Sequence, residues 1–501
     1  MKRLMSRLHC TAVGLALAVG SAHAQEPFDS NPNWISTDTQ VSTGAGLVDL
    51  DRDGWLDLVV ANGNDMSLQR LAVYYNRGDG TLPQTPDWQS DDTAYNGHLD
   101  VADVNGDGWP DVAVAVLGRF STVGHAAKLY LNNQGVLSST PDWQSDETTH
   151  AFGCAFGDVN NDGRPDLAVG TGWAYSNEPY DYHQYVYLNN GGSLSAVADW
   201  VSDDEDHLQG VLWTDANRDG WLDLVGVAAA AETRVYANLG GTLETTASWQ
   251  TTDSAAQDAI MVVAGDVTGD GLDELIVTDN IQLAGSGRFR QYDGVASGFF
   301  ETVFSWSFYD GNGSAVALAD INGDGHLDLA TGAWWDQTRL FFNDGSGLPA
   351  QPSWSSGPSS VIEKIVFGDV DRNSLRQTTD ALPASGRSLF SLAHRPIQEV
   401  LAVRRDGVDL GPGDYHLDRD DGWITTALPP TVALEVDYLW STAPDMAVTN
   451  WDSTVGNHLY YNKLVGFFVS GFETGDFSEW SSVSTDRGPI HIPSRGGPAS
   501  D

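Results

Sequence analysis

Cysteine is nearly absent from this chain of 501 residues. The two cysteines are Cys10 and Cys154, and Cys10 lies in an N-terminal segment that we expect to be cleaved. Cys154 then has no partner within the mature chain, which excludes a disulfide framework as the source of stability in an exported protein. Something other than disulfides must hold the fold together.

Basic residues are also scarce. Lys and Arg total 25 against 69 Asp and Glu, which gives a formal net charge of -44. Such an excess of negative charge disfavours binding to nucleic acid or to an anionic membrane surface. Cations are the natural partners of this chain, and we expect it to be a monomer.

Long hydrophobic runs are missing as well, so no membrane span is predicted. The longest candidate runs from Thr11 to Val19, follows basic residues and precedes Ala22-His23-Ala24, where small residues occupy the two positions that a signal peptidase reads. This order of charge, apolar core and cleavage site predicts a signal peptide over residues 1–24. The mature chain is expected to be exported.

Common catalytic motifs do not occur in the sequence. There is no G-x-S-x-G, no H-E-x-x-H and no cysteine with credible catalytic partners. Asp181, His183 and Asp336 are only suggestive candidates for acid–base chemistry. We expect a protein that acts by binding. A carbohydrate-active enzyme (a polysaccharide lyase or a glycosidase) and a purely structural scaffold remain as alternatives.

One acidic loop, in contrast, is abundant. Successive copies begin 49 to 57 residues apart. They read DLDRDGWLD from Asp49, DVNGDGWPD from Asp103, DVNNDGRPD from Asp158, DANRDGWLD from Asp215, DVTGDGLDE from Asp266 and DINGDGHLD from Asp320, and a seventh begins as DVDRN at Asp369. A unit of about fifty residues is the length of a four-stranded sheet in a β-propeller.

A second marker gives the same count. A tryptophan precedes each loop by 14 to 17 residues: Trp34, Trp88, Trp143, Trp200, Trp249, Trp306 and Trp354. Between these markers run strand-like segments of four to seven residues bounded by Gly, Asn, Pro or Asp, with no helical period. The predicted fold is all-β, a seven-bladed β-propeller of four-stranded antiparallel blades. Residues 33–38 are expected to supply the outermost strand of the last blade and so to close the ring.

The chemistry of the loop points to a metal ion. Counted from the first aspartate, acidic, amide or hydroxyl side chains occupy positions 1, 3, 5 and 9, and Gly stands at position 6 of every complete copy. Side chains of alternate loop residues can converge, and without a cation their carboxylates would repel one another. An all-oxygen shell suits Ca²⁺, whereas soft metals are disfavoured because no ligand position holds Cys or His. Six or seven calcium ions are therefore predicted.

This loop between strands resembles the calcium-binding FG-GAP repeat, also described as the VCBS repeat, of the integrin alpha-subunit propeller and of many secreted bacterial proteins. An EF-hand does not fit, since position 12 holds Val, Gly or Thr instead of Glu. The resemblance covers residues 33–373 and 445–462. It implies these metal ligands: Asp49, Asp51, Asp53, Asp57; Asp103, Asn105, Asp107, Asp111; Asp158, Asn160, Asp162, Asp166; Asp215, Asn217, Asp219, Asp223; Asp266, Thr268, Asp270, Glu274; Asp320, Asn322, Asp324 and Asp328.

The seventh loop is interrupted after Asn373. The expected continuation resumes at Asp445, and residues 374–444 between them read as a small β unit inserted in the seventh blade, which should project from the face that carries the loops. Two outcomes fit the sequence. An insertion with adjacent ends would leave the ligands Asp369, Asp371, Asn373 and Asp445 together, whereas one with separated ends would destroy the site. The insertion is either a partner-binding module or a tolerated surface addition.

Ligand recognition is expected on the opposite face of the propeller. Loops between second and third strands carry aromatic residues that offer flat apolar rings with polar edges, suited to a carbohydrate or a protein ligand. The alternative is that these rings pack between blades. The candidates are Trp173, Tyr175, Tyr180, Tyr182, Trp334, Trp335 and Trp451.

The sequence thus predicts a signal peptide over 1–24, a propeller over 25–462 with the insertion 374–444, and a C-terminal tail over 463–501. The tail resembles short C-terminal segments of proteobacterial exported proteins. That resemblance implies a secreted, periplasmic or cell-surface protein of a Gram-negative bacterium. A secreted calcium-binding propeller that serves adhesion or ligand recognition is the function that the sequence favours.

Overall fold

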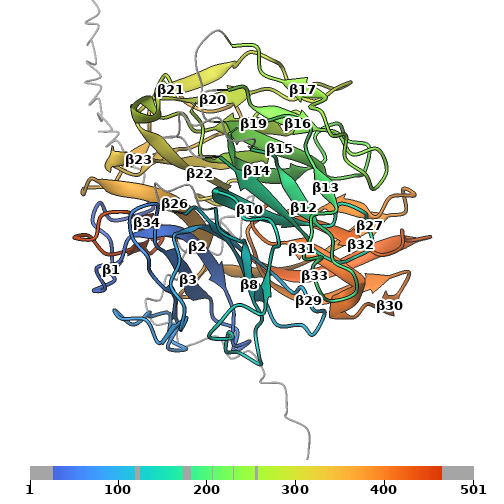
Figure 1. Cartoon of the computed structure of the whole chain (residues 1–501), viewed down its shortest axis with the longest axis horizontal. Helices are drawn as coiled ribbons and strands as arrows, with labels where there is room; N and C mark the ends of the chain where they lie inside the picture. Colours follow the sequence, from blue (N-terminus) through green and yellow to red (C-terminus); the bar gives the residue numbers. More distant parts are fainter. Residues whose placement is uncertain are drawn as a thin grey trace, which may run out of the picture.

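The computed structural model describes residues 26–118, 124–172, 182–205, 207–228, 231–253 and 258–464 (Figure 1). These residues form 35 β-strands and two 3-10 helices of three residues each, η1 (Ile281–Leu283) and η2 (Pro412–Asp414). In this part of the chain no helix has the length and apolar character needed to cross a bilayer. The protein is all-β, as predicted from the short strand-like segments.

Five sheets follow one plan. Each contains four antiparallel strands in chain order. The strands are β2 (Ser42–Val48), β3 (Asp57–Asn62), β4 (Leu71–Tyr74), β5 (Trp88–Gln89); β6 (Asn96–Ala102), β7 (Asp111–Val116), β8 (Lys128–Tyr130), β9 (Trp143–Gln144); β10 (Ala151–Gly157), β11 (Asp166–Thr171), β12 (Tyr185–Tyr187), β13 (Trp200–Val201); β14 (Leu208–Thr214), β15 (Asp223–Ala228), β16 (Arg234–Tyr236), β17 (Trp249–Gln250); β18 (Val262–Gly265), β19 (Glu274–Val277), β20 (Arg288–Tyr292) and β21 (Trp306–Tyr309).

A sixth, eight-stranded sheet contains two groups of four strands. The first group is β22 (Gly313–Ala319), β23 (Asp328–Asp336), β24 (Arg339–Phe341) and β25 (Trp354–Ser355), and the second is β26 (Ser360–Gly368), β34 (Asp445–Asn450), β35 (His458–Tyr460) and β1 (Trp34–Ile35). The groups join because the long strand β23 also pairs with β26, Trp334 opposite Val361. In the second group Trp34 pairs with Leu459, so the two ends of the described chain meet in one sheet.

The first strands of the sheets surround the centre of the molecule. Neighbouring sheets contact each other through β2 and β6, β6 and β10, β10 and β14, β14 and β18, β18 and β22, β22 and β26, and β26 and β2. Second strands such as β7 are buried along their whole length between neighbouring sheets, which explains the apolar run VAVAV that follows Asp111. This radial arrangement of four-stranded units is that of a β-propeller.

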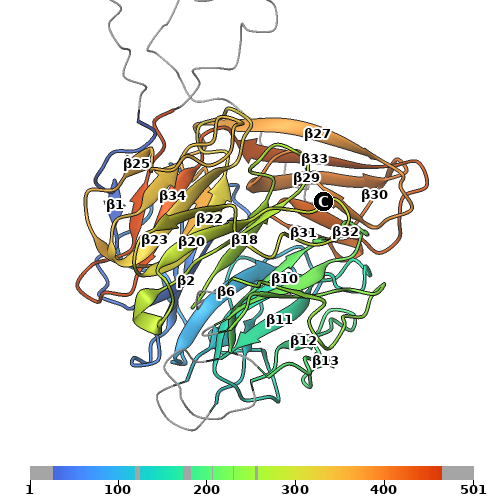
Figure 2. The same ribbon diagram turned by 90° about the horizontal axis from the view of Figure 1, so that it is seen from above.

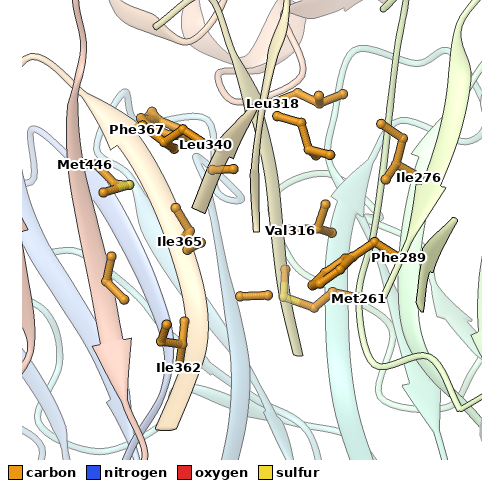
Figure 3. Close-up of a cluster of buried hydrophobic side chains, with 14 of the residues drawn as sticks. Met261, Ile276, Phe289, Val316, Leu318, Leu340, Ile362, Ile365, Phe367 and Met446 are labelled. Carbon is orange, nitrogen blue, oxygen red and sulfur yellow. The ribbon is translucent and has the colours of Figure 1, made fainter. Parts of the chain in front are cut away.

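The core lies between the faces of neighbouring sheets. In Figure 3, Phe289 of β20, Val316 of β22 and Ile365 of β26 belong to one buried cluster that spans three groups of strands. The marker tryptophans lie at the start of the outermost strands, and several pack edge-on against a tyrosine of the next sheet. The rings of Trp143 and Tyr187, for example, are 5.3 Å apart at 75°.

The interrupted repeat contains two further sheets between β26 and β34. One has the order β27 (Leu375–Pro383), β33 (Ala433–Ser441), β29 (Ile397–Arg405), β30 (Val408–Asp409), and the other β28 (Leu389–Ser391), β32 (Trp423–Thr426), β31 (Tyr415–Asp418). They enclose a small core of their own. Instead of projecting freely, this insertion lies across the face that carries the acidic loops, since Leu389 and Trp423 pack with Val159 and Trp213 in one cluster (Figure 2).

Candidate functional site

Each acidic loop connects the first strand of a repeat to the second. The residue at position 9 is always the first residue of the second strand, for example Asp111 at the start of β7. All the loops therefore lie at the same end of the sheets. The loops between second and third strands, which carry the aromatic candidates, lie at the other end because the strands are antiparallel.

Positions 1 and 6 give the loop its shape. In the second loop the amide of Gly108 donates to the carboxylate of Asp103 at 2.6 Å, and the same bond occurs in all six complete copies at 2.6 to 2.9 Å. The glycines at position 6 have φ between +83° and +93°. Only glycine adopts this backbone conformation without strain, which explains its presence in every complete copy.

Positions 3 and 5 turn their side chains back to the loop backbone. Asn105 accepts a hydrogen bond from the amide of Asp107 at 2.9 Å, and Asp107 accepts one from the amide of Trp109 at 2.9 Å. These local bonds hold the side chains beside the carboxylate at position 1 and leave each of them further lone pairs. Positions 1, 3 and 5 thus offer oxygen atoms at one side of the loop.

The carboxylate at position 9 anchors the loop by accepting backbone amides. Asp111 is fully buried and accepts the amides of Val104 at 2.9 Å and Asn132 at 2.7 Å. In the fifth loop the longer Glu274 accepts the amides of Val267 and Thr268 instead. The carboxylate at position 9 is therefore a structural residue of the loop as well as a candidate ligand.

Two loops bring three carboxylates close enough to share one metal ion. Oxygen atoms of Asp49, Asp51 and Asp57 lie within 4.8 Å of one another, and so do those of Asp369, Asp371 and Asp445. The other loops carry an amide or a hydroxyl at position 3, namely Asn105, Asn160, Asn217, Thr268 and Asn322.

The seventh loop keeps its geometry despite the insertion of 71 residues. Leu375 and Ser441 are paired neighbours on β27 and β33, so the insertion begins and ends at one place and returns the chain to Asp445. The hydroxyl of Ser374, at position 6, donates to Asp369 at 2.8 Å where the other loops use a glycine amide alone. Of the two outcomes considered from the sequence, the structure has the one with adjacent ends.

The donor set fits a hard cation. Burial, reinforced by neighbouring carboxylates, raises the pKa of Asp57 and Asp328 to about 8 and that of Asp111 to about 7. Moreover, Oδ1 of Asp49 and Oδ1 of Asp215 are buried without a hydrogen-bond partner among the described residues. Buried carboxylate oxygens that lack a donor are costly unless a cation compensates them.

These shifts predict an unusual pH dependence. Without a cation the folded chain holds protons on Asp57 and Asp328 up to about pH 8, while the unfolded chain releases them near pH 3.8. The free energy of unfolding of the metal-free protein therefore falls as the pH rises between these values. Since a bound cation needs deprotonated ligands, calcium should raise the melting temperature more at pH 8 than at pH 5. Calorimetry with calcium and with chelator at both pH values measures this difference, and equal shifts would contradict it.

The structure also reveals six asparagines that the sequence reasoning missed. We call them the bridging asparagines: each lies at the end of a third strand and donates from Nδ2 to a position 2 carbonyl in the loop of the neighbouring sheet. The distances are 2.7 to 3.0 Å for Asn76, Asn132, Asn189, Asn238, Asn343 and Asn462. The bond from Asn76 to Val370 links the first loop region to the last. A repeated Tyr-x-Asn or Phe-x-Asn pattern was the available signal.

One sheet lacks this bridge. At the corresponding position after β20 stands Gly294, two residues beyond Tyr292 and paired with Phe300 as Asn132 is with Leu137. Glycine has no amide side chain, so the bond to the carbonyl of Ala216 in the fourth loop cannot form through this position.

At the opposite end, the structure brings together three of the aromatic candidates. The rings of Trp334 and Trp451 stack at 5.3 Å and 24°, and Trp335 meets Trp334 edge-on at 5.9 Å. Trp335 is 55% exposed and has a φ of +62°, a strained backbone conformation for a bulky residue. Strain of this kind is commonly kept at functional sites.

Other aromatic candidates differ from the expectation. Trp334 is buried because β23 continues past it and pairs with β26, and its Nε1 donates to Glu363 at 2.6 Å. Tyr182 is also buried and packs against His207. Neither ring is offered to a ligand. Trp173, Tyr175 and Tyr180 lie outside the described residues.

The suggestive catalytic residues have structural partners. Asp336 pairs with Arg339 at 3.0 Å, and Nδ1 of His183 bonds to the carbonyl oxygen of Ser202 at 2.6 Å. Asp181 lies outside the described residues. The buried Cys154 forms no disulfide.

Comparison with known proteins identifies the repeats. A family model described as FG-GAP-like repeat matches residues 49–114, 116–169 and 215–277, and a model described as FG-GAP repeat matches residues 155–193 and 312–337. Human integrin alpha-7 is 36% identical over 107 residues, and integrin alpha-3 of Cricetulus griseus is 32% identical over 134 residues. The matches cover 20% and 25% of this chain but only 8% and 12% of those proteins.

Solved structures with a similar outline are distant. Sqt1 of Saccharomyces cerevisiae aligns with a TM-score of 0.47 and 9% identity, over 87% of this chain and 99% of that one. BBS1N, crystallised in complex with ARL6DN, aligns with a TM-score of 0.44 and 13% identity, over 83% and 96% of the two chains. The family models, in contrast, fall directly on the acidic loops and their flanking strands, and the chain contains FG-GAP repeats that are similar to those of integrin alpha subunits.

Proposed function

We propose that this protein is an exported, calcium-stabilised β-propeller of seven blades that recognises a carbohydrate or protein ligand without catalysing a reaction. Export rests on the signal-peptide pattern over residues 1–24, and the propeller would span residues 25–462 of the mature chain. The insertion 374–444 and the tail 463–501 would be additions to this module. The competing functions are a carbohydrate-active enzyme and a structural scaffold.

Seven blades are supported by the way in which the sheets follow one another. The five four-stranded sheets and the two groups of the eight-stranded sheet each begin with a strand that contacts the next around the centre, and β26 contacts β2. The bridging asparagines support the same count, because six of the seven successive contacts carry one and Gly294 stands at the remaining position.

Calcium is supported by one observation above all: six complete loops present the same converging oxygen atoms, and buried oxygens of Asp49 and Asp215 have no donor among the described residues. When bound, Ca²⁺ would neutralise charge that the fold concentrates. The chain's own part is to hold positions 1, 3, 5 and 9 in place through backbone hydrogen bonds. Six complete loops and the reassembled seventh give six or seven ions.

Recognition of a ligand is best supported at Trp335. Its exposed ring stands at the end of the sheets opposite to the loops and meets edge-on the ring of Trp334, which in turn stacks on Trp451. A flat ring held in place loses little conformational entropy when a sugar ring or a protein side chain packs on it. Ligand binding is also the coarse function to which the similarity with integrin alpha subunits points.

The direct test is binding of the mature protein to a broad glycan array, with calcium and with EDTA in parallel. Specific binding that EDTA abolishes would support calcium-dependent sugar recognition. Binding to no glycan in either condition would favour a protein partner, to be sought by pull-down from the native cell envelope, or a scaffold. Sustained formation of cleaved polysaccharide would establish an enzyme and contradict the proposal.

Trp335→Ala should remove ligand binding and leave the melting temperature unchanged, because the ring is exposed and its loss opens no cavity. Tyr309→Ala, which removes another exposed ring at 54% exposure, is the matched control and should bind normally. Trp334→Ala is a poor probe since loss of its buried ring is expected to cost about 3 to 5 kcal/mol of stability. Ligand affinity and thermal melting of the three variants decide the matter, and full affinity in Trp335→Ala would refute this site.

A further inference from the structure

A cleft of about 720 Å³ separates the insertion from the acidic loops of the fourth, fifth and sixth repeats. The loop wall includes Asp215, Asp266 and Asp320, and the insertion wall includes His394 and Trp440. This volume falls within the range of about 300 to 1,000 Å³ that is typical of ligand-binding sites. The cleft lies at the opposite end of the sheets from Trp335.

The position without an asparagine bridge lies at this cleft. Gly294 and Ala216, the two residues between which the bridge cannot form, both line the cleft. A Cβ atom at Gly294 would lie 2.5 Å from the carbonyl oxygen of Asp273, so the backbone leaves no room for any side chain at this position. The cleft is therefore built into the fold and does not result from one absent side chain that another residue could replace.

Arginines fix the two walls relative to each other. Arg387 donates to the carbonyl of Arg218 at 2.8 Å, and Arg395 donates to the carbonyl of Ala264 at 2.9 Å. Arg218 in turn donates to the carbonyl of Val295 at 3.0 Å. These bonds between distant segments hold the insertion against the loops, so the cleft is preformed before a ligand arrives.

The lining combines ring faces with polar groups of both signs. His394 stacks on Trp440 with ring centroids 3.6 Å apart and planes 3° apart, which makes a rigid aromatic platform at the cleft. The side chain of Arg387 is 44% exposed. Trp423, which lines the cleft and is only 7% exposed, has an Nε1 donor without a hydrogen-bond partner among the described residues. Unused donors of this kind favour a ligand with many acceptors.

We propose that this cleft binds a short, uncharged oligosaccharide. Five carboxylates line it, from Asp215, Asp266, Asp273, Asp320 and Asp421, and they would repel a polyanion. Three arginines line it too, Arg218, Arg387 and Arg395, so a polycation would meet charges of both signs. Sugar hydroxyls donate to carboxylates and accept from guanidinium groups, while the apolar face of a sugar ring packs on an aromatic platform. An uncharged sugar chain is the class of ligand that uses the whole lining.

The test is calorimetric titration of the full chain with tetrasaccharides of glucose, mannose and galactose, and with tetragalacturonate as their charged counterpart. At least one uncharged tetrasaccharide should bind, and His394→Ala should weaken it at least about tenfold. Ser391→Trp is a second variant that keeps the platform but fills the cleft, because Ser391 is an exposed lining residue at the end of β28. It should weaken binding as strongly, whereas Tyr309→Ala, which removes an exposed ring outside the cleft, should leave the affinity unchanged.

Titrations are made with calcium and with chelator, and binding in either condition supports the cleft, so the outcome is separate from that of the calcium proposal. Weaker binding in the two variants that line the cleft separates it from the site at Trp335. The inference is overturned if no uncharged tetrasaccharide binds the folded protein at millimolar concentration. It is also overturned if tetragalacturonate binds more tightly than every uncharged sugar. Full affinity in folded Ser391→Trp overturns it as well, even should His394→Ala fail to fold.

Discussion

Removal of calcium is expected to lower the melting temperature of this protein by about 9 °C or more. In the metal-free chain, carboxylates such as Asp49 and Asp57 face one another across a short loop, and burial opposes their ionisation. Folding must then concentrate negative charge in a chain that already carries a net charge of -44. A cation in each loop removes this cost only in the folded state, because the unfolded chain cannot assemble the oxygen shell.

The size of the effect follows from the number of sites. A ligand at about 100 times its dissociation constant stabilises the folded state by about 2.7 kcal/mol per site. Six complete loops that each contribute even half of this amount would together add about 8 kcal/mol, which is comparable to the whole stability of many domains. No disulfide among the described residues compensates for the loss, since Cys154 is unpaired.

The measurement is thermal unfolding at pH 8 with millimolar calcium, with EDTA, and with magnesium as the specificity control. Magnesium should restore less stability than calcium because it requires near-octahedral geometry and gives up its water ligands reluctantly. A melting temperature that changes by less than about 2 °C between calcium and EDTA would show that the loops are ordinary acidic turns.

Asn132→Ala is expected to cost about 3 kcal/mol of unfolding free energy. The buried amide of Asn132 donates to the carbonyls of Leu50 and Pro110 at 2.9 and 3.1 Å, and its oxygen accepts the amide of Gly135 at 2.8 Å. Alanine would leave two carbonyls and one amide without their partner between two sheets, at a point where water has little access.

The adjacent Asn133 is the matched control. Its side chain donates to the hydroxyl of Ser138 at 3.0 Å on the exposed side of the same turn, so Asn133→Ala should cost less than about 0.5 kcal/mol. Denaturant unfolding of both variants in excess calcium measures the difference. Equal stability of the two variants would mean that the bridging asparagines do not hold neighbouring sheets together.

The repeated loops could be predicted well because their residues are determined locally. Gly at position 6 is required by a φ near +90°, and Asp at position 1 is required by the amide that this glycine directs toward it. Both constraints act within nine residues and recur at a constant interval. The all-β fold followed from the same regularity, since strands of few residues between turn residues leave no room for a helix.

Features that depend on contacts between repeats were not predictable in the same way. The bridging asparagines donate hydrogen bonds to carbonyls of another repeat. The partner lies 76 positions away in the sequence for Asn343 and 294 positions away for Asn76. The burial of Trp334 depends on the pairing of the extended strand β23 with β26, which no local sequence pattern predicts.

Position 4 of the loop has a left-handed backbone even where it holds Arg52, Arg218 or Arg372. Two of these side chains lie over a tryptophan of the next loop, Arg52 over Trp109 and Arg372 over Trp55.

The insertion shows the same limit most clearly. Its strands were expected from alternating sequence, yet its position against the loops depends on contacts between distant segments, such as the hydrogen bond from Arg395 to Ala264 and the buried cluster that holds Trp423 and Trp213. The cleft beneath it is lined by Gly294, a residue that differs from the asparagine of the other repeats. The insertion and Gly294, the two departures from the repeat pattern, both contribute to the cleft, a feature that the regular repeats do not predict.

The central claim is that the acidic loops are calcium sites of one propeller. Crystals grown in calcium, with an anomalous difference map recorded at long wavelength, test it most directly. The account predicts a peak beside positions 1, 3 and 5 in each of the six complete loops, and a seventh between Asp369, Asp371 and Asp445. Well-ordered loops without anomalous peaks, in crystals that contain millimolar calcium, would contradict it.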